Sequence, residues 1–410
     1  MSKVIFLNFP THGCINSLLA TASELVNRGE KIIYYCTEEF RNKIEKTGAE
    51  FRPYKGLINE FRIENDDLFE ALKLTVEMTV DKLDYNLDSI RRETPDYIIH
   101  DSLCTWGKHI ASILGIPAVN LMHSYPVTRS SISLTNYTAP FLMKVGLYKL
   151  NNNLKRNSFK KILKKKYGIH LSVGDILINK EGLNIVYTSK HMELRVYQSE
   201  FTYRFVGPSL FFKNEQNGFP FDKLRDKSVI YISLGTLHNR NSEFYRTCIS
   251  AFSDTKYYVV ISAGFETNMN EFNNLPNNFL IRQSVPQQKL LEHVELFITH
   301  AGMNSVNEAI CNGVPMLLLP HQFEQEMIAK RVKEMGIGMK MSIKRITPGK
   351  LYENANQLIS DPKYKKQALE FKSIMNREEK ISHVKAADEI LHYIKNVTYA
   401  YSGSASGTKS

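Results

Sequence analysis

Polar side chains gather in one short stretch of the sequence, residues 296–325, which reads LFITHAGMNSVNEAICNGVPMLLLPHQFEQ. His300, Asn304 and Ser305 stand at the start of an expected helix, where free backbone N–H groups and the helix dipole favour a phosphate group. Glu308 follows one helical turn later, where its carboxylate can accept hydrogen bonds from the hydroxyl groups of a ribose. This combination predicts a site for a nucleoside diphosphate.

The elements expected around these residues place them at one edge of a sheet. The apolar runs 296–298 and 314–319 are typical of buried strands, and 304–311 between them is typical of a helix. Glu324 and Gln325 follow the second strand and therefore lie at the same carboxyl edge, where open α/β sheets bind nucleotides. The alternative, that each residue only caps or begins a helix, accounts for single positions but not for all six polar residues.

A second turn in the same half has the small residues that a phosphate requires. Ser233, Gly235 and Thr236 follow the expected strand 228–233. Small residues directly after a first strand let a phosphate approach the backbone. An ordinary turn between a strand and a helix is the alternative.

The stretch 296–325 resembles the donor-binding signature of the UDP-glycosyltransferases of the macrolide and flavonoid type, glycosyltransferase family 1. That signature reads approximately HxGxNSxxExxxxGVPxxxxPxxxEQ, and every fixed letter is present. The resemblance extends along nearly the whole chain. It implies the GT-B fold, an α/β architecture in which two Rossmann-like domains with parallel sheets face each other across a cleft.

The resemblance also implies a role for each polar residue. His300, Asn304 and Ser305 would bind the diphosphate, Glu308 the ribose, and Glu324 with Gln325 the hydroxyl groups of the sugar. The full implied donor set is Ser233, Gly235, Thr236, Val285, Gln287, His300, Gly302, Asn304, Ser305, Glu308, Glu324 and Gln325.

One departure from the family concerns the base of the donor. Many members carry Trp-x-Pro-Gln where this chain has Ser284, Val285, Pro286 and Gln287. The family's Trp stacks on uracil, so the aromatic platform is missing here. Val285 can still offer backbone hydrogen bonds to a uracil.

A second departure concerns the catalytic base. The family has a pattern similar to HGHxNP after the first strand, in which a His takes the proton of the acceptor and an Asp orients it. This chain reads HGCINS over residues 12–17, so that Cys14 stands where that His is expected. Asp101, after the expected strand 96–100, matches the orienting Asp. The catalytic candidates are therefore His12, Cys14 and Asp101.

Three interpretations of this departure stay open. His12 could serve as the base with Asp101. An acidic acceptor, such as a phenol or a carboxylic acid, would need no strong base. The protein could also have lost catalysis and bind a sugar nucleotide for another purpose. An unperturbed thiol is mostly protonated at neutral pH, which makes Cys14 a less attractive base.

The order of the expected elements predicts two domains. A strand at 3–9, a helix opened by Ser17 and a strand at 31–36 form a βαβ unit at the start of the chain. The predicted boundaries are an acceptor-binding domain 1–206, a linker 207–226, a donor-binding domain 227–380, a last helix 381–397 that crosses back to the first domain, and a disordered tail 402–410.

Composition narrows the class of protein. The 410 residues suffice for two domains, 43% are hydrophobic, and no apolar run approaches the roughly 20 residues that span a bilayer. The beginning of the sequence lacks a signal-peptide pattern, and five scattered cysteines without a CxxC argue against a disulfide framework or a zinc site. A cytoplasmic protein is expected.

The net charge of +11 arises in part from one run, KRNSFKKILKKK, at 155–166. A solvated helix face is the favoured interpretation, with contact to an anionic membrane or to an acidic acceptor as the alternatives. Nucleic acid is not expected as a partner, because no recognition motif accompanies the run. The chain also has no Asp-x-Asp sequence, so no metal ion is expected at the donor.

These observations predict an inverting glycosyltransferase, acting as a monomer or homodimer. It would move a hexose, most simply glucose from UDP-glucose, to a hydroxyl group of a small hydrophobic acceptor such as a macrolide, a flavonoid or another natural product. The alternatives are a catalytically silent sugar-nucleotide-binding protein and a lipid glycosyltransferase that works at a membrane surface.

Overall fold

The computed structural model describes residues 1–57, 68–125, 156–170, 176, 179–193, 202–210, 218–235 and 241–406. The chain divides into two compact units. Unit 1 comprises Met1–Phe212 and Glu379–Ser410, and unit 2 comprises Lys213–Glu378. No helix among the described residues is long and apolar enough to cross a membrane.

Unit 1 is built on a parallel sheet with the strand order β3-β2-β1-β4-β5-β6-β7. Its strands are β1 (Lys3–Leu7), β2 (Lys31–Cys36), β3 (Glu50–Pro53), β4 (Tyr97–Asp101), β5 (Ala118–Met122), β6 (Leu183–Val186) and β7 (Tyr203–Phe205). Its helices are α1 (His12–Asn27), α2 (Arg41–Glu45), α3 (Leu68–Arg92), α4 (Thr105–Leu114), α7 (Arg156–Tyr167) and α15 (Ser382–Ser406).

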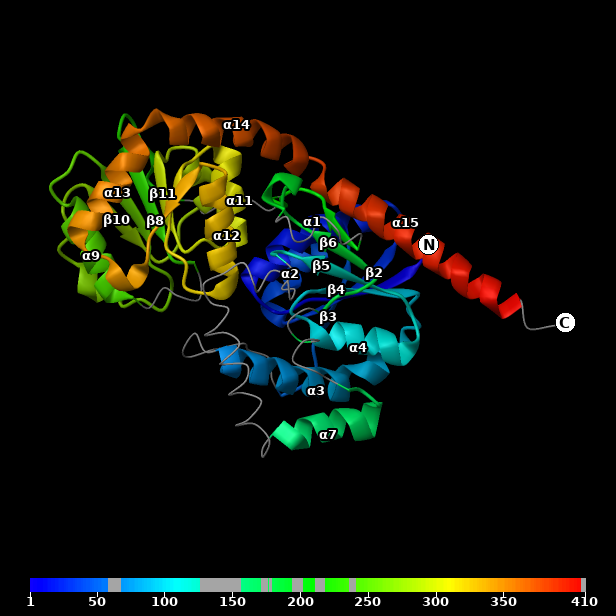
Figure 1. The fold of residues 1–410 in the computed structure, drawn as a ribbon. Coiled ribbons are helices and arrows are strands. Elements are labelled where there is room, and N and C mark those ends of the chain that lie inside the picture. The colour runs from blue at the N-terminus through cyan, green and yellow to red at the C-terminus, as the bar shows by residue number, and fades with distance from the viewer. Residues whose placement is uncertain are drawn as a thin grey trace. The chain divides into compact units, whose positions relative to one another are not determined.

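Helices cover both faces of this sheet, and alternate residues of each strand therefore enter different cores (Figure 1). Val4 and Phe6 of β1 join a core with α1 and α15, whereas Ile5 and Leu7 join a second core with α3, α4 and α7. Burial on both faces explains why the strands read as almost continuous apolar runs. The single tryptophan of the chain, Trp106, is fully buried in the second core.

Helix α1 begins five residues before the position expected from the sequence. Thr11, with extended backbone angles, is its N-cap, and His12 is its first residue. Ser17 lies inside the helix, where its hydroxyl donates to the carbonyl of Cys14 at 3.0 Å. A serine hydroxyl can donate to a backbone carbonyl inside a helix as well as near its start. The prediction that Ser17 is the N-cap of this helix was therefore wrong. The shift places Cys14 in the first turn.

Helix α15 completes the first core of unit 1. Ala386, Ala387 and Ile390 are fully buried in the same cluster as the apolar face of α1. Arg28 of α1 adds an ion pair to Asp388 at 2.5 Å. The helix continues to Ser406, whereas the sequence predicts a disordered tail from residue 402, and 407–410 lie outside the described residues.

The basic run at 155–166 and the predicted linker at 207–226 both contain helices that bury an apolar residue. The basic run at 155–166 lies largely in α7, whose Leu163 is buried in the second core of unit 1 while Lys164 and Lys165 are exposed. The predicted linker contains a short 3₁₀ helix, Phe221–Leu224, whose Leu224 is buried. An apolar anchor of this kind is not visible in a stretch selected for its glycines and prolines.

Unit 2 is a parallel sheet with the strand order β10-β9-β8-β11-β12-β13. Its strands are β8 (Val229–Ser233), β9 (Tyr258–Ser262), β10 (Phe279–Arg282), β11 (Leu296–Thr299), β12 (Met316–Leu318) and β13 (Gly338–Lys340). Its helices are α9 (Ser242–Phe252), α10 (Gln287–Leu291), α11 (Met303–Asn312), α12 (Phe323–Glu334), α13 (Pro348–Ser360) and α14 (Pro362–Glu379). The predicted α/β class, with two Rossmann-like domains built on parallel sheets, is confirmed.

Candidate active site

The strand order of unit 2 reverses between β8 and β11, the position at which open α/β sheets bind ligands. Gly235 follows β8 with a φ of +79°, and a Cβ built on it would lie 2.6 Å from Cε1 of His300. A Cβ on Gly302 would lie 2.5 Å from Nε2 of the same ring. A side chain at either position would therefore displace the His300 imidazole, which lies beside both glycines at this switch point.

Ala301 turns the chain from β11 into α11. Its φ of +68° is uncommon for a residue other than glycine, and its side chain is fully buried. Gly302 is the N-cap of α11, so that Asn304 and Ser305 lie in the first turn, where backbone N–H groups lack partners within the helix. The residues predicted to bind a diphosphate therefore stand at a helix N-terminus beside His300.

A hydrogen-bonded cluster joins α10 to α11. Nε2 of Gln287 donates to Oε2 of Glu308 at 2.6 Å and lies 3.3 Å from Oγ of Ser305. Tyr231 of β8 donates to Oε1 of Gln287 at 2.8 Å and thereby fixes the orientation of the amide. Gln288 donates to the other oxygen of Glu308 at 3.4 Å. The structure thus brings together Gln287, Ser305 and Glu308, which the sequence placed 21 residues apart at most.

The environment of Glu308 prepares its carboxylate for hydrogen-bond donors. Burial raises the pKa of Glu308, and the hydrogen bonds from Gln287 and Gln288 oppose the rise. A carboxylate accepts about four hydrogen bonds, so two amide donors leave room for two more. A pair of vicinal hydroxyl groups would supply them.

Glu324 and Gln325 begin helix α12 after strand β12, at the predicted edge. Oε1 of Gln325 accepts from the backbone N–H groups of His321 and Gln322 at 2.8 and 3.2 Å. The oxygen of this side chain is therefore engaged in capping the helix, which leaves its amide nitrogen for a ligand. Val285 is buried beside α10, and Thr236 lies outside the described residues.

The strand order of unit 1 reverses between β1 and β4, and Asp101 is the last residue of β4. Its Oδ2 accepts from Asn8 Nδ2 at 2.9 Å and from the N–H of Phe9, and its Oδ1 accepts from the N–H groups of Leu103 and Cys104 at 2.7 and 3.0 Å. These four donors fill the lone-pair positions of the carboxylate. Burial raises the pKa of Asp101 to about 6, and the backbone donors, Phe9 first, oppose the rise.

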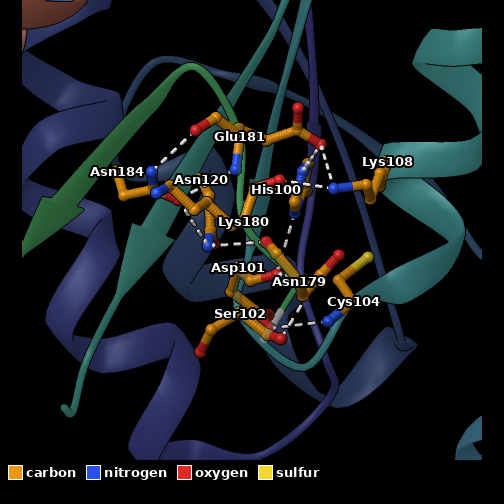
Figure 2. Close-up of polar contacts among 10 residues, drawn as sticks. All are labelled: His100, Asp101, Ser102, Cys104, Lys108, Asn120, Asn179, Lys180, Glu181 and Asn184. Carbon is orange, nitrogen blue, oxygen red and sulfur yellow. Dashed lines mark hydrogen bonds and ion pairs between the residues drawn. The ribbon is translucent and has the colours of Figure 1, made fainter. Parts of the chain in front are cut away.

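A polar network behind Asp101 holds the end of β4 in place (Figure 2). Nδ1 of His100 donates to the carbonyl of Asp101 at 2.9 Å, and Nε2 of the same ring lies 3.2 Å from Oε1 of Glu181. Asn179 donates to the carbonyl of Ser102 at 3.1 Å. Since a carbonyl only accepts, Nδ1 of His100 carries a proton. This network is a rigid support for Asp101.

Cys14 contacts a histidine that the sequence interpretation missed. Its Sγ accepts from the hydroxyl of Thr11 at 3.0 Å and lies 3.6 Å from Nε2 of His123. His123 follows the carboxyl end of β5 directly. Nδ1 of His123 is buried and has no hydrogen-bond partner within the described parts of the chain. Burial lowers the pKa of His123 to about 4.

The side chain of His12 lies outside the described residues, so its proposed role as base stays a prediction. The signal that could have revealed His123 is its position, because a histidine directly after a buried strand lies at the carboxyl edge of the sheet. That rule alone does not say which side chain it meets. The pairing with Cys14 depends on the strand order, which puts β5 beside β4 and β4 beside β1.

Comparison with known proteins adds independent findings. Residues 222–395 match the family model described as UDP-glucoronosyl and UDP-glucosyl transferase. The NDP-glycosyltransferase YjiC of Bacillus subtilis (strain 168) is 32% identical over 365 residues, which cover 87% of this chain and 89% of that protein. The uncharacterized UDP-glucosyltransferase YojK of the same organism is 29% identical over 409 residues, with 97% and 99% coverage.

Among solved structures, the crystal structure of CalG4, the calicheamicin glycosyltransferase, superimposes with a TM-score of 0.74. The sequence identity is 26%, and the match covers 97% of this chain and 99% of that one. The similarity therefore extends over both units of the chain.

Proposed function

Because the chain belongs to the family of UDP-glucoronosyl and UDP-glucosyl transferases and has the GT-B fold, we propose that it is an inverting hexosyltransferase. It uses a nucleotide-sugar donor and a small-molecule acceptor. The donor we propose is UDP-glucose, and the acceptor is a small hydrophobic natural product that offers a hydroxyl group. No metal ion takes part in this proposal.

The observation that carries the proposal is the cluster of Gln287, Ser305 and Glu308 at the start of α11. Gln287 holds the Glu308 carboxylate beside the first turn of the helix, so one short segment offers a ribose acceptor and phosphate donors together. Hydrogen bonds to charged groups contribute about 1.5–3 kcal/mol each.

The donor roles follow from the chemistry of each group. The N-terminus of α11, with Asn304 and Ser305 in its first turn, stabilises the diphosphate, and His300 lies beside that turn. As the bond between the anomeric carbon and the phosphate oxygen breaks, negative charge grows on the UDP. Fixed dipoles aimed at that charge lower the barrier more than they strengthen substrate binding. Glu324 and the amide nitrogen of Gln325 are proposed to bind the hydroxyl groups of the hexose.

The choice of UDP and glucose rests on the names of two relatives and on the residues expected beside the base. The relative YojK is named as a UDP-glucosyltransferase, whereas the relative YjiC is named as an NDP-glycosyltransferase. Ser284 stands where the resemblance expects an aromatic residue on the base, and Val285 behind it is buried. We therefore propose UDP as the preferred nucleotide, selected by backbone contacts at Val285 rather than by stacking.

The test is a mass-spectrometric screen of hydroxylated acceptors with UDP-glucose and UDP-N-acetylglucosamine. We expect acceptors that gain one hexosyl group, and release of UDP in equal amount. Glu308→Ala should lose at least tenfold in UDP affinity, because one lost hydrogen bond to a charged group is worth about 1.5–3 kcal/mol. Glu353→Ala, an exposed glutamate on α13, is the matched control and should leave affinity unchanged. Tight UDP binding without transfer to any acceptor would support the silent binding protein instead.

A further inference from the structure

Cys14 replaces the imidazole that the resemblance expects, but the structure places another imidazole next to it. Sγ of Cys14 lies 3.6 Å from Nε2 of His123, which is within the range of a hydrogen bond to sulfur. A thiol and a histidine at this separation form the pair that activates cysteine nucleophiles and can also pass protons. The two residues are 109 positions apart in the sequence and meet only through the order of the strands.

We propose that Cys14 and His123 form a two-step proton relay that replaces the missing base. This inference rests on the proposed hexosyl transfer. The acceptor hydroxyl gives its proton to Sγ of Cys14, while the thiol gives its own proton to Nε2 of His123. Cys14 is the catalytic residue, since it touches the reacting hydroxyl, and His123 is a positioning residue that also stores the proton.

The step is balanced. The acceptor oxygen forms a bond to the anomeric carbon, the bond from that carbon to the phosphate oxygen breaks, and UDP leaves with the electron pair. One proton moves from the acceptor to sulfur and one from sulfur to His123, so the thiol is regenerated. His123 as a residue is half-buried, and its proton returns to solvent before the next turnover.

Three features of the surroundings favour this relay. Thr11 donates its hydroxyl to Sγ at 3.0 Å and can stabilise negative charge that grows on the sulfur. Cys14 is the third residue of α1, where the helix dipole also favours negative charge. The residue is only 2% exposed, so bulk water is largely excluded from the thiol and the acceptor hydroxyl must displace a neighbouring contact to reach Sγ.

His123 rests as the neutral imidazole, the form that can receive a proton, although the burial that keeps it neutral also makes it a weaker base than a solvated histidine. Nδ1 is buried without a hydrogen-bond partner among the described residues, so a second proton on the ring is not stabilised in the resting protein. Burial lowers its pKa to about 4, so the ring is neutral at pH 7 and one of its nitrogens keeps a free lone pair. When the proton is on Nδ1, the lone pair of Nε2 faces the thiol.

Asp101 cannot take over the part of His123 without losing existing contacts. Its carboxylate already accepts four hydrogen bonds, including those from Asn8 and Leu103. An additional donor would have to displace one of them. His123 is therefore the better placed partner for residue 14, and Asp101 serves to hold the ends of β1 and β4 together.

The test compares one alkyl alcohol and one phenol of similar size, both chosen from the acceptors that the parent protein glucosylates with UDP-glucose. His123→Gln should lower kcat on the alcohol by about 10²–10⁴-fold, the usual value of general base catalysis. The phenol loses its proton more easily and should lose less than about tenfold. KM for UDP-glucose should stay the same. His170→Gln changes an exposed histidine of the same unit in the same way and should have no effect.

Two substitutions of Cys14 separate relay from packing. Cys14→Ala removes the relay and should match His123→Gln on both acceptors. Cys14→Ser keeps a proton-carrying group and should recover part of the activity on the alcohol. A structural defect would instead lower transfer to the alcohol and the phenol equally.

The outcomes distinguish the relay from the proposed function. If the parent transfers glucose to both acceptors and His123→Gln leaves the alcohol rate unchanged, the relay is wrong and the proposed function stands. If the parent accepts phenols but no alcohols in the whole screen, the relay is also wrong, since acidic acceptors need no base. If the parent transfers to no acceptor at all, the proposed function fails and the relay fails with it.

Discussion

Gln287 should raise the affinity of the protein for UDP mainly by holding the Glu308 carboxylate in place. Its Nε2 donates to Glu308 at 2.6 Å, a hydrogen bond to a charged acceptor in a buried setting. Such bonds contribute about 1.5–3 kcal/mol. Gln287→Ala removes the bond, leaves the Glu308 carboxylate free to rotate, and raises the pKa of Glu308 further. UDP affinity should therefore fall by about tenfold or more.

The assay is titration calorimetry with UDP on four proteins: the parent, Gln287→Ala, Glu308→Ala and the double variant. If Gln287 acts by holding Glu308, then Gln287→Ala should cost little once Glu308 is already alanine. The coupling free energy of the cycle would then be about 1–3 kcal/mol. Gln283→Ala, at an exposed position just before α10, is the control and should bind as the parent does.

Additive effects in this cycle would refute the reasoning, because they would mean that Gln287 and Glu308 contribute independently. Loss of the Tyr231 hydrogen bond is a separate effect of Gln287→Ala. It should lower stability by about 1 kcal/mol in both backgrounds and therefore cancel from the cycle.

Ile390→Ala, in the fully buried part of α15, should lower the free energy of unfolding of unit 1 by about 2–5 kcal/mol, whereas Ile381→Ala, at a position that is 43% exposed, should not. Urea denaturation followed by the fluorescence of the single tryptophan measures both, and equal midpoints would mean that α15 does not stabilise unit 1. Gly235→Ala should weaken UDP binding at least tenfold, because its Cβ would displace the nearby imidazole, while Gly349→Ala has open space and should bind normally; equal affinities would contradict the described turn. Burial lowers the pKa of His123 from 6.5 to about 4, so between these pH values the unfolded chain binds a proton that the folded chain does not. Relative to His123→Gln, the parent should therefore lose on the order of 3 kcal/mol of stability as the pH falls through this window, because the other groups that titrate there, Asp101 among them, are common to both proteins; parallel profiles for the two proteins would show that the imidazole is not buried in neutral form.

Much of the donor side could be predicted from the sequence because it lies within a short stretch. His300 precedes helix α11 by a short turn, Ser305 and Glu308 are one helical turn apart, and the apolar runs around them have the length of buried strands. In a parallel sheet the carboxyl ends of neighbouring strands share one edge, so strand order matters little for residues this close. Gln287 was predicted only from the family resemblance, and the structure places it against Glu308.

The rest depends on contacts that one sequence does not encode locally. The meeting of Cys14 and His123 requires both the strand order of unit 1 and the early start of α1 at His12. Gln325 was predicted only as a ligand of the sugar, whereas the oxygen of its side-chain amide caps helix α12. A polar side chain at the start of a helix can form hydrogen bonds either with the backbone or with a ligand. Only the position of its atoms in the structure distinguishes the two roles.

Asp101 illustrates a further limit. Its position at the end of β4 follows from the sequence, but the number of donors around it does not. Two come from the chain after β1 and two from the turn into α4, and together they occupy the carboxylate. A match to a family position therefore locates this residue without saying what it binds.

The most direct test of the central claim is the anomeric configuration of the product, measured by proton NMR on an acceptor glucosylated with UDP-glucose. The sugar of UDP-glucose is α-linked, and a single in-line displacement inverts the anomeric carbon. The account predicts a β-glucoside together with one UDP per product. An α-glucoside would contradict it, because retention requires a second displacement, for which the thiol of Cys14 would be the candidate nucleophile. Bound UDP-glucose with no glucoside of either configuration would contradict the transferase function itself.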